Sequence, residues 1–313
     1  MEKGVSRLGA ELPYRRAAET YTALTRIPIS PKAVEGITKG NGEALGEEMA
    51  KEMAFAMGEE IEPPGPREGG RGLPWGVTID GTTILTEEGW REVKVGAVFR
   101  FGPVRGEVKA QEISYRAGLW KAEEMGEALW AETRRRGIDT VYEDVEVVIG
   151  DGAAWIWNLA QTHYWGATQI VDWYHAEERL WGVGKAMYGE GEERTRGWVE
   201  ARLGQLWGGD VEGVILQLEA LKPHRAEAKE VVAQALSYFT HQARRMRYPK
   251  YREKGYPIGS GPVESACKNM VGSRLKRGGM RWSCEGAQAV LNLRSELMSG
   301  RWDEAWRRLR QAA

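Results

Sequence analysis

The chain has 313 residues, of which 42% are hydrophobic, so it is long enough for one large or two ordinary domains with real cores. It has two cysteines, Cys267 and Cys284, and no CxxC pair, which argues against a disulfide framework or a structural zinc site and predicts a reduced, cytoplasmic compartment. No apolar run approaches the roughly 20 residues of a membrane span, and the first residues lack the apolar stretch of a signal peptide.

The charge is balanced over the whole chain but not along it. The formal net charge is −1, which by itself neither favours nor excludes a nucleic-acid partner. From Arg244 to the end, 16 Lys and Arg stand against 6 Asp and Glu, and the preceding residues are acidic overall. This asymmetry indicates either a polyanion-binding end or a set of solvated helix faces.

Helices are expected in residues 1–57, which form an N-terminal segment. One spans residues 12–24; a second begins at Pro31, with Ser30 as its N-cap, and runs to residue 40. Two short helices with a tight link suit either a DNA-reading helix-turn-helix or an ordinary helical hairpin. Residues 58–74 are rich in proline and glycine and are predicted to be a linker at a domain boundary.

Residues 75–175 change to an α/β pattern. Strands are predicted at residues 77–80, 93–101, 108–115, 145–149 and 168–171, with helices at 121–136, where Gly137 ends the helix, and at 153–163. Three strands, a helix, a strand, a helix and a strand predict a mixed α/β sheet with helical cover.

Residues 176–254 follow a helical period and are predicted to be an all-helical insertion. We expect no strand in residues 180–245 and no sheet pairing after them. Residues 255–313 return to the α/β domain with basic helices at 262–275, 284–298 and 303–310.

Three acidic residues occupy positions that suit a site. Asp80 ends an apolar strand, although Asp-Gly is also a cue for a hairpin turn. Asp151 lies between two glycines after a buried strand, where α/β proteins gather their sites, although it also suits a helix cap. Glu264 falls in the first turn of a helix that begins at Pro262 with Gly261 as N-cap, where it also complements the helix dipole. None of the three is specific alone.

Together with their surroundings, these residues resemble a family. VTIDGT, VVIGDGAAWIWN and PIGSGPVESACKNMVGSRLKRGGMRWSCEGAQAVLNLRS are similar to the three acidic blocks of bacterial insertion-sequence transposases of the ISKra type. The resemblance covers most of the chain and implies a DDE transposase with a ribonuclease H-like catalytic domain, formed by residues 75–175 and 255–313. It assigns the catalytic and metal-binding triad to Asp80, Asp151 and Glu264. The 113 positions between the last two exceed a bare ribonuclease H-like core, and the helical insertion accounts for the excess.

The implied chemistry is phosphodiester cleavage with two Mg²⁺ or Mn²⁺ ions, because hard oxygen ligands suit these cations. Water would cut a strand at the transposon end and free a 3′-OH, which would then attack target DNA without a covalent enzyme intermediate. Two alternatives stay open. One is a nuclease on the same fold, and the other is a truncated or domesticated copy that binds DNA without transposing it.

Two further groups accompany the triad. Asp172 and His175 form a D-x-x-H element after a strand, similar to one in several transposases with helical insertions, and are expected to support the site or position the substrate. The alternative is a helix cap and a partly buried histidine. The basic residues after Glu264 are expected to neutralise phosphates near the scissile bond, or to form a solvated helix face; they are Lys268, Arg274, Lys276, Arg277 and Arg281.

The expected partners are transposon ends and target DNA, bound at the nucleoid by a homodimer or higher oligomer, with no membrane. Full-length members of the family usually carry a longer N-terminal region. The resemblance therefore indicates either a truncated copy or the product of an internal start, and predicts DNA binding that is weak, salt-sensitive and little dependent on sequence.

Overall fold

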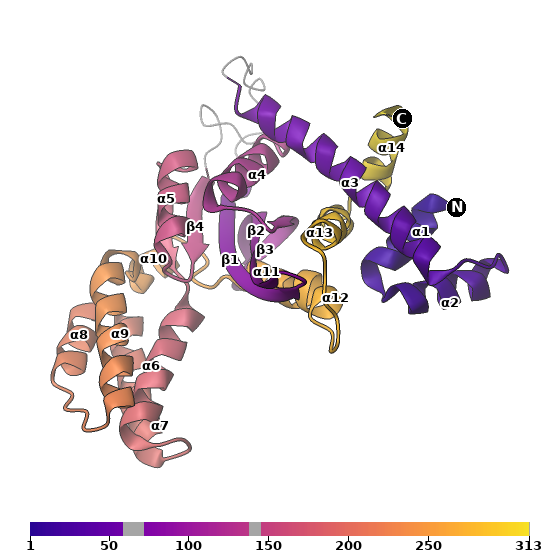
Figure 1. Ribbon diagram of the computed structural model, residues 1–313. Helices are drawn as coiled ribbons and strands as arrows, with labels where there is room; N and C mark the ends of the chain where they lie inside the picture. The colour runs from indigo at the N-terminus through magenta and orange to yellow at the C-terminus, as the bar shows by residue number, and fades with distance from the viewer. Residues whose placement is uncertain (59–71, 138–144, 313) are drawn as a thin grey trace.

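Five apolar segments pair into one mixed sheet with the strand order β3-β2-β1-β4-β5 (Figure 1). The computed structural model describes residues 1–58, 72–137 and 145–312, so the predicted linker lies mostly outside the described residues. The strands are β1 (Trp75–Thr86), β2 (Gly89–Val104), β3 (Glu107–Gly118), β4 (Val145–Gly150) and β5 (Thr168–Val171). β1, β2 and β3 are antiparallel neighbours, and β4 and β5 run parallel to β1. The predicted mixed α/β sheet is confirmed.

The first hairpin is longer than predicted, and its Asp80-Gly81 pair lies within a strand and not in a turn. Asp80 lies in the middle of β1 and is paired with Val95, so the interpretation of Asp80 as a turn residue is wrong. The chain turns instead after Thr86, whose hydroxyl donates to the carbonyl oxygen of Gly89 over 2.7 Å. Gly89 has φ 103, a conformation that favours glycine.

Helices cover both faces of the sheet. α4 (Ala122–Arg135) and α5 (Ala154–His163) pack on one face. They approach the strands closely because Gly96 has no side chain; a Cβ there would lie 2.5 Å from the terminal methyl of Met125 on α4. The opposite face packs Val93 and Val95 against helices from the end of the chain. Because paired residues share a face, Asp80 lies on this second face with Val95.

The helices on the side of the second face come from residues 261–298. They are α11 (Gly261–Ala266), the π-helical turn η2 (Cys267–Gly272), α12 (Ser273–Leu275) and α13 (Cys284–Met298). The last helix, α14 (Trp302–Ala312), packs on α13 and on the N-terminal segment. The predicted helices are present, but the first one contains a π-helical turn that periodicity did not predict. α11 begins at Gly261 with Ser260 as its N-cap, one residue earlier than the sequence indicated.

The N-terminal segment contains three helices, α1 (Glu2–Glu11), α2 (Tyr14–Thr25) and α3 (Pro31–Ala56). α1 was not predicted, and the end of α3 at residue 40 was predicted wrongly. The helix continues through its glycines because they allow contact with α13. A Cβ on Gly42 would lie 2.3 Å from the carbonyl oxygen of Ala289, and one on Gly46 would lie 2.6 Å from Nδ2 of Asn292. Figure 1 shows α3 crossing beside α13.

Buried ion pairs tie these helices to the sheet. Arg116 on β3 is only 3% exposed and contacts Glu132, Glu296 and Glu52 at 2.9, 2.8 and 3.2 Å. Arg301 binds the same Glu132 and Glu296 at 2.6 and 3.0 Å. Burial raises the pKa of both of these glutamates, but the arginines outweigh it and hold each pKa below its usual value. Because α3, α4 and α13 all contribute to this network, removing one buried charge would leave its partners with fewer counter-charges in a buried place.

Residues 173–253 form a helical insertion between β5 and α11 (Figure 1). Its helices are α6 (Trp173–Tyr188), α7 (Glu193–Gly208), α8 (Val211–Glu219), α9 (Ala226–Gln242), the short η1 (Ala243–Arg245) and α10 (Tyr248–Glu253). The prediction that residues 180–245 contain no strand is confirmed. The prediction that pairing does not resume is wrong at one point, because Trp282 forms an isolated bridge with Thr86. None of the helices described here is both long and apolar enough to cross a membrane.

Candidate functional site

Asp80 reaches the second face of the sheet from the centre of β1. The backbone N–H of Gly81 donates to its Oδ1 over 2.7 Å, and the thiol of Cys267 lies 3.5 Å from its Oδ2. Cys267 directly follows α11, so this contact places the end of α11 over Asp80. The carboxylate is therefore held from two sides, by its own strand and by the helix above it.

Asp151 lies beside Asp80 at the end of the neighbouring strand. The parallel register pairs Ile79 with Gly150, so the two aspartates occupy the next positions on strands that run about 4.8 Å apart. Oδ1 of Asp151 accepts a hydrogen bond from the N–H of Ala153 over 2.7 Å. This bond shapes the loop before α5, whose N-cap is Ala153, so the simple interpretation of Asp151 as the N-cap is wrong.

The helical insertion holds the loop that carries Asp151. The hydroxyl of Tyr238 donates to the carbonyl oxygen of Asp151 over 2.8 Å, and the side-chain amide of Gln242 donates to that of Gly152 over 2.9 Å. Both residues lie on α9. Gly152 has φ 108, which explains the glycine at this point. The insertion thus contributes to the geometry of the candidate site.

Glu264 approaches from the other side, in the first turn of α11. Ser260 donates from its hydroxyl to Oε1 of Glu264 over 3.3 Å, and the rest of the side chain is exposed. Cys267, which contacts Asp80, follows one turn later on the same helical face. Glu264, Asp80, His175 and Lys276 all line one pocket of about 850 Å³. The pocket therefore joins the first and third acidic blocks, whereas Asp151 does not line it and is linked to it through its place beside Asp80.

The carboxylates influence each other's ionisation. Burial, followed by the charge of Asp151, raises the pKa of Asp80 above its usual value, against the opposing effects of Gly81 and His175. Burial and the charges of Asp172 and Asp80 likewise raise the pKa of Glu264. Burial is the main cause of both shifts, and repulsion between the ionised carboxylates adds to it. Such a set favours a bound cation or a neighbouring positive side chain.

Asp172 and His175 provide part of that positive charge. Asp172 is fully buried and caps α6, accepting from the N–H of His175 over 3.0 Å. Nδ1 of His175 lies 3.5 Å from Oδ1 of Asp172, a separation typical of an ion pair rather than of a short hydrogen bond. Asp172, followed by Asp80 and Asp151, raises the pKa of His175 to about 9 against burial, so the imidazole is charged at neutral pH.

Asp172 also joins the insertion to α11. Its second oxygen, Oδ2, accepts a hydrogen bond from the backbone N–H of Ser260, the N-cap of α11. Burial would raise the pKa of Asp172, but the bonds from His175 and Ser260 outweigh it and lower the pKa. The helix-cap interpretation is therefore confirmed, yet the same carboxylate also fixes the start of the helix that carries Glu264.

The predicted basic residues separate into different environments. Lys268 and Lys276 are exposed and line the same pocket as the carboxylates, and the ammonium group of Lys276 donates to the hydroxyl of Thr82. Arg277 is exposed beyond the pocket, where its guanidinium binds the carbonyl oxygen of Ser273. Arg281 is exposed and lines a second pocket of about 480 Å³.

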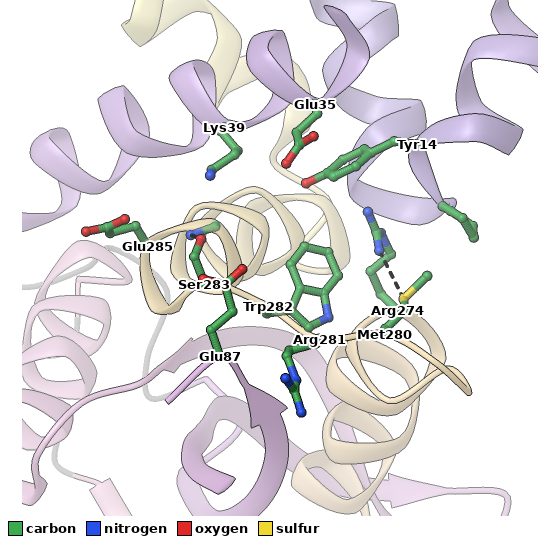
Figure 2. A pocket seen from close by; sticks show the side chains of 12 residues that line it. Tyr14, Glu35, Lys39, Glu87, Arg274, Met280, Arg281, Trp282, Ser283 and Glu285 are labelled. Carbon is green, nitrogen blue, oxygen red and sulfur yellow. Dashed lines mark hydrogen bonds between the residues drawn. The ribbon is translucent and has the colours of Figure 1, made fainter. Parts of the chain in front are cut away.

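The prediction that Arg274 contacts DNA is wrong for this structure. Its side chain is 1% exposed, and Nε and Nη2 donate to the carbonyl oxygen of Gly9 over 3.1 and 3.0 Å. The guanidinium lies over the rings of Tyr14 and Trp282, with its carbon 4.9 and 4.6 Å from the ring centres. Figure 2 shows this group beside Met280 at the edge of the second pocket. Arg274 therefore holds α1 against α12.

Residues that sequence reasoning missed also shape the site. Ser260, Cys267 and Tyr238 bind the acidic residues or their backbone, and Tyr174 forms part of the pocket wall. Cys267 could have been found from its spacing of three residues from Glu264, which places both on one helical face. Tyr238 lies 87 residues from Asp151 and carries no local signal.

The acidic side chains of the site do not form a closed metal-binding group. Within residues 1–58, 72–137 and 145–312, no group of three or more His, Cys, Asp and Glu side chains is close enough to hold a metal ion. No protein-family model matches the chain, and no curated protein matches it. The fold and the site define the chain as an α/β protein with a carboxylate-lined pocket over the centre of a mixed sheet.

Proposed function

We propose that this chain is the catalytic part of a DDE transposase, which cuts DNA at transposon ends and joins the freed ends to target DNA. The observation that carries the proposal is the register that sets Asp80 beside Asp151, with Glu264 on a helix that packs over β1 and β2 and lines one pocket with Asp80. Three antiparallel strands followed by two parallel ones support a ribonuclease H-like fold. DNA as the substrate places the protein at the nucleoid in the cytoplasm.

The donor set fits Mg²⁺ or Mn²⁺. Asp80, Asp151 and Glu264 offer only carboxylate oxygens, and the charges of neighbouring carboxylates add to burial in raising the pKa of Asp80 and of Glu264. These three residues would hold the ions. Two such ions, when bound, stabilise the attacking and leaving oxygens of an in-line displacement at phosphorus.

The other side chains of the pocket hold the reactants and the ligands in place. Lys268 and Lys276, at the pocket wall, bind phosphates on either side of the scissile bond. His175 keeps a positive charge near Asp80 and Asp151, and Asp172 fixes its orientation.

The proposed reaction has two displacement steps. Water oxygen bonds to the scissile phosphorus as the bond to the 3′-oxygen breaks, and the 3′-OH is released with the proton that the water loses. The oxygen of that 3′-OH then bonds to a phosphorus of the target strand as the bond from this phosphorus to its own 3′-oxygen breaks, and the target's 3′-oxygen leaves as a 3′-OH with the proton that the attacking hydroxyl loses. Two ends must be joined to one target, so we propose that a homodimer or a higher oligomer acts on DNA.

One experiment tests the proposal. The purified chain is incubated with Mg²⁺, a labelled duplex taken from the DNA that flanks its gene, and a supercoiled target plasmid. Labelled DNA joined to the plasmid supports the transposase. Nicks without joining would replace it with a nuclease, and a gel shift without cleavage would replace it with a DNA-binding protein. Asp80→Asn serves as the inactive control for contaminating nucleases.

A further inference from the structure

An aromatic side chain stands exposed at the pocket of the carboxylates. Tyr174 lines this pocket and is 57% exposed, although it lies in the first turn of a well-anchored helix. Asp172 before it is buried, and the N–H of Trp173 donates to the carbonyl oxygen of Ile258 over 2.9 Å. The ring of Trp173 packs inward at 5.0 Å from the ring of Tyr248. With its neighbours fixed, Tyr174 is held outward.

The chain leaves room for this ring on its other side. A Cβ at Gly259 would lie 3.0 Å from Cε2 and 3.4 Å from Cδ2 of Tyr174. Gly259 is not among the described glycines with positive φ, so its backbone does not require glycine, whereas the position of the ring does. Within the described parts of the chain, the hydroxyl of Tyr174 makes no hydrogen bond. An exposed ring that is held outward beside Gly259 and makes no hydrogen bond to the described residues is suited to bind the flat face of another ring.

We propose that Tyr174 is a stacking platform for one unpaired nucleobase of the DNA end, next to the phosphate that the carboxylates cut. The inference rests on the proposed function and deepens it, because it names the form of DNA that the site takes. The ring shares the pocket with Glu264 and with Lys268 and Lys276, so a nucleotide can place its phosphate near the lysines and its base on the ring. Aromatic stacking is the usual way in which proteins hold unpaired bases, and it tolerates any sequence.

A stacking platform at this pocket favours DNA whose terminal base is unpaired. In a blunt duplex the terminal base is paired with the complementary strand, so it must unpair before it can stack on Tyr174. Stacking on Tyr174 offsets part of the free energy lost when the terminal pair opens. We therefore expect preference for a frayed or overhanging end over a blunt one.

The test compares two DNA probes. One is a blunt duplex, and the other is the same duplex with a three-nucleotide 3′ extension that carries 2-aminopurine. Binding is measured by anisotropy in Ca²⁺, and stacking by quenching of the 2-aminopurine. The variants are Tyr174→Ala, Tyr174→Phe and Gly259→Ala, which displaces the ring without removing it. The matched control is Trp165→Ala, because Trp165 is 81% exposed and does not line the pocket.

The expected result is specific to the extended probe. Tyr174→Ala should raise its Kd roughly 5- to 150-fold and abolish the quenching, while the Kd of the blunt duplex changes by less than about two-fold. Tyr174→Phe and the Trp165 variant should behave like the wild type, and Gly259→Ala should lie between. Equal loss on both probes, or no loss on either, would overturn the stacking platform and leave the transposase proposal standing if the wild type still joins DNA. A wild type that neither binds nor cuts DNA would overturn both.

Discussion

Replacing Asp80 with asparagine distinguishes two possible roles of this residue, a metal ligand and a purely structural aspartate. Asp80 lies on β1 and Asp151 directly follows β4, the neighbouring strand. Two unit charges separated by the usual spacing of strands, about 4.8 Å, repel by about 3.5 kcal/mol at an effective dielectric of 20, which is the upper limit of the repulsion between these side chains. Both side chains are partly exposed, so solvent screening reduces the effect to about 1 kcal/mol. Asn retains the shape of the side chain and still accepts from Gly81. We therefore expect Asp80→Asn to unfold about 2–4 °C higher than the wild type in EDTA at pH 7.

The difference in stability between the wild type and Asp80→Asn should depend on pH. Burial and Asp151 raise the pKa of Asp80, so the unfavourable interaction is absent at low pH, where the carboxyl is protonated. It develops as the pH rises from the usual pKa of 3.8 through the raised value, and the wild type loses stability over that range. The difference between wild type and Asp80→Asn should therefore be present at pH 7 and disappear below about pH 3.8.

The assay is thermal melting with EDTA and with Mg²⁺. A cation that binds only the folded wild type raises its stability by about 1.4 kcal/mol at ten times its Kd, and the variant should lose this shift together with DNA cleavage. The control is Asp210→Asn, because Asp210 caps α8 by accepting from the N–H of Gly213 over 2.9 Å and does not line the pocket. It should keep its full Mg²⁺ shift. If Asp80→Asn melts lower in EDTA and keeps the shift, the carboxylate is structural and the reasoning fails.

Three further results are expected. Arg274→Ala should lose about 2–4 kcal/mol of stability, because it leaves the carbonyl of Gly9 unpaired and a cavity in the core. Arg277→Ala should leave the melting temperature unchanged, and equal melting temperatures for the two variants would contradict the burial of Arg274. His175 should titrate near pH 9 by NMR in EDTA, and the stability that its positive charge contributes should be complete below pH 6.5 and lost as the pH rises through 9. Asp172→Asn should lower the pKa of His175, and an unchanged pKa would exclude the ion pair. DNA affinity should fall steeply with salt and vary little with sequence, and a footprint on one sequence at physiological salt would refute this.

The sheet could be predicted from the sequence because its signals are local. The apolar runs of β4 and β5 and the period of α4 lie within single elements, and the structure keeps them nearly where the pattern puts them. The end of α3 could not be predicted in this way. Its glycines normally weaken a helix, but Gly42 lies against α13, which is more than 240 residues away in the sequence. Packing between distant segments decided this boundary.

The candidate site could be predicted only in part, because its residues have local signals but their arrangement depends on packing between distant segments. Asp80, Asp151 and Glu264 each had a plausible structural role, and only the register between β1 and β4 brings the first two together. The link from Asp172 to the N–H of Ser260 spans 88 positions and leaves no trace in either local pattern. The sequence indicated which residues to consider, whereas pairing and packing determined which of them meet.

The basic residues after Glu264 show how one irregular turn changes the result. In a regular α-helix, Lys276 would lie about 120° around the axis from Glu264, away from the pocket. The π-helical turn at Cys267–Gly272 adds one residue, so Lys276 takes the place of the eleventh residue and lies within about 20° of Glu264. Arg274 then takes the place of the ninth, about 180° away, which is the buried side. The same turn therefore directs one basic side chain into the pocket and the other into the core, and a prediction based on an unbroken helical period must misplace one of them.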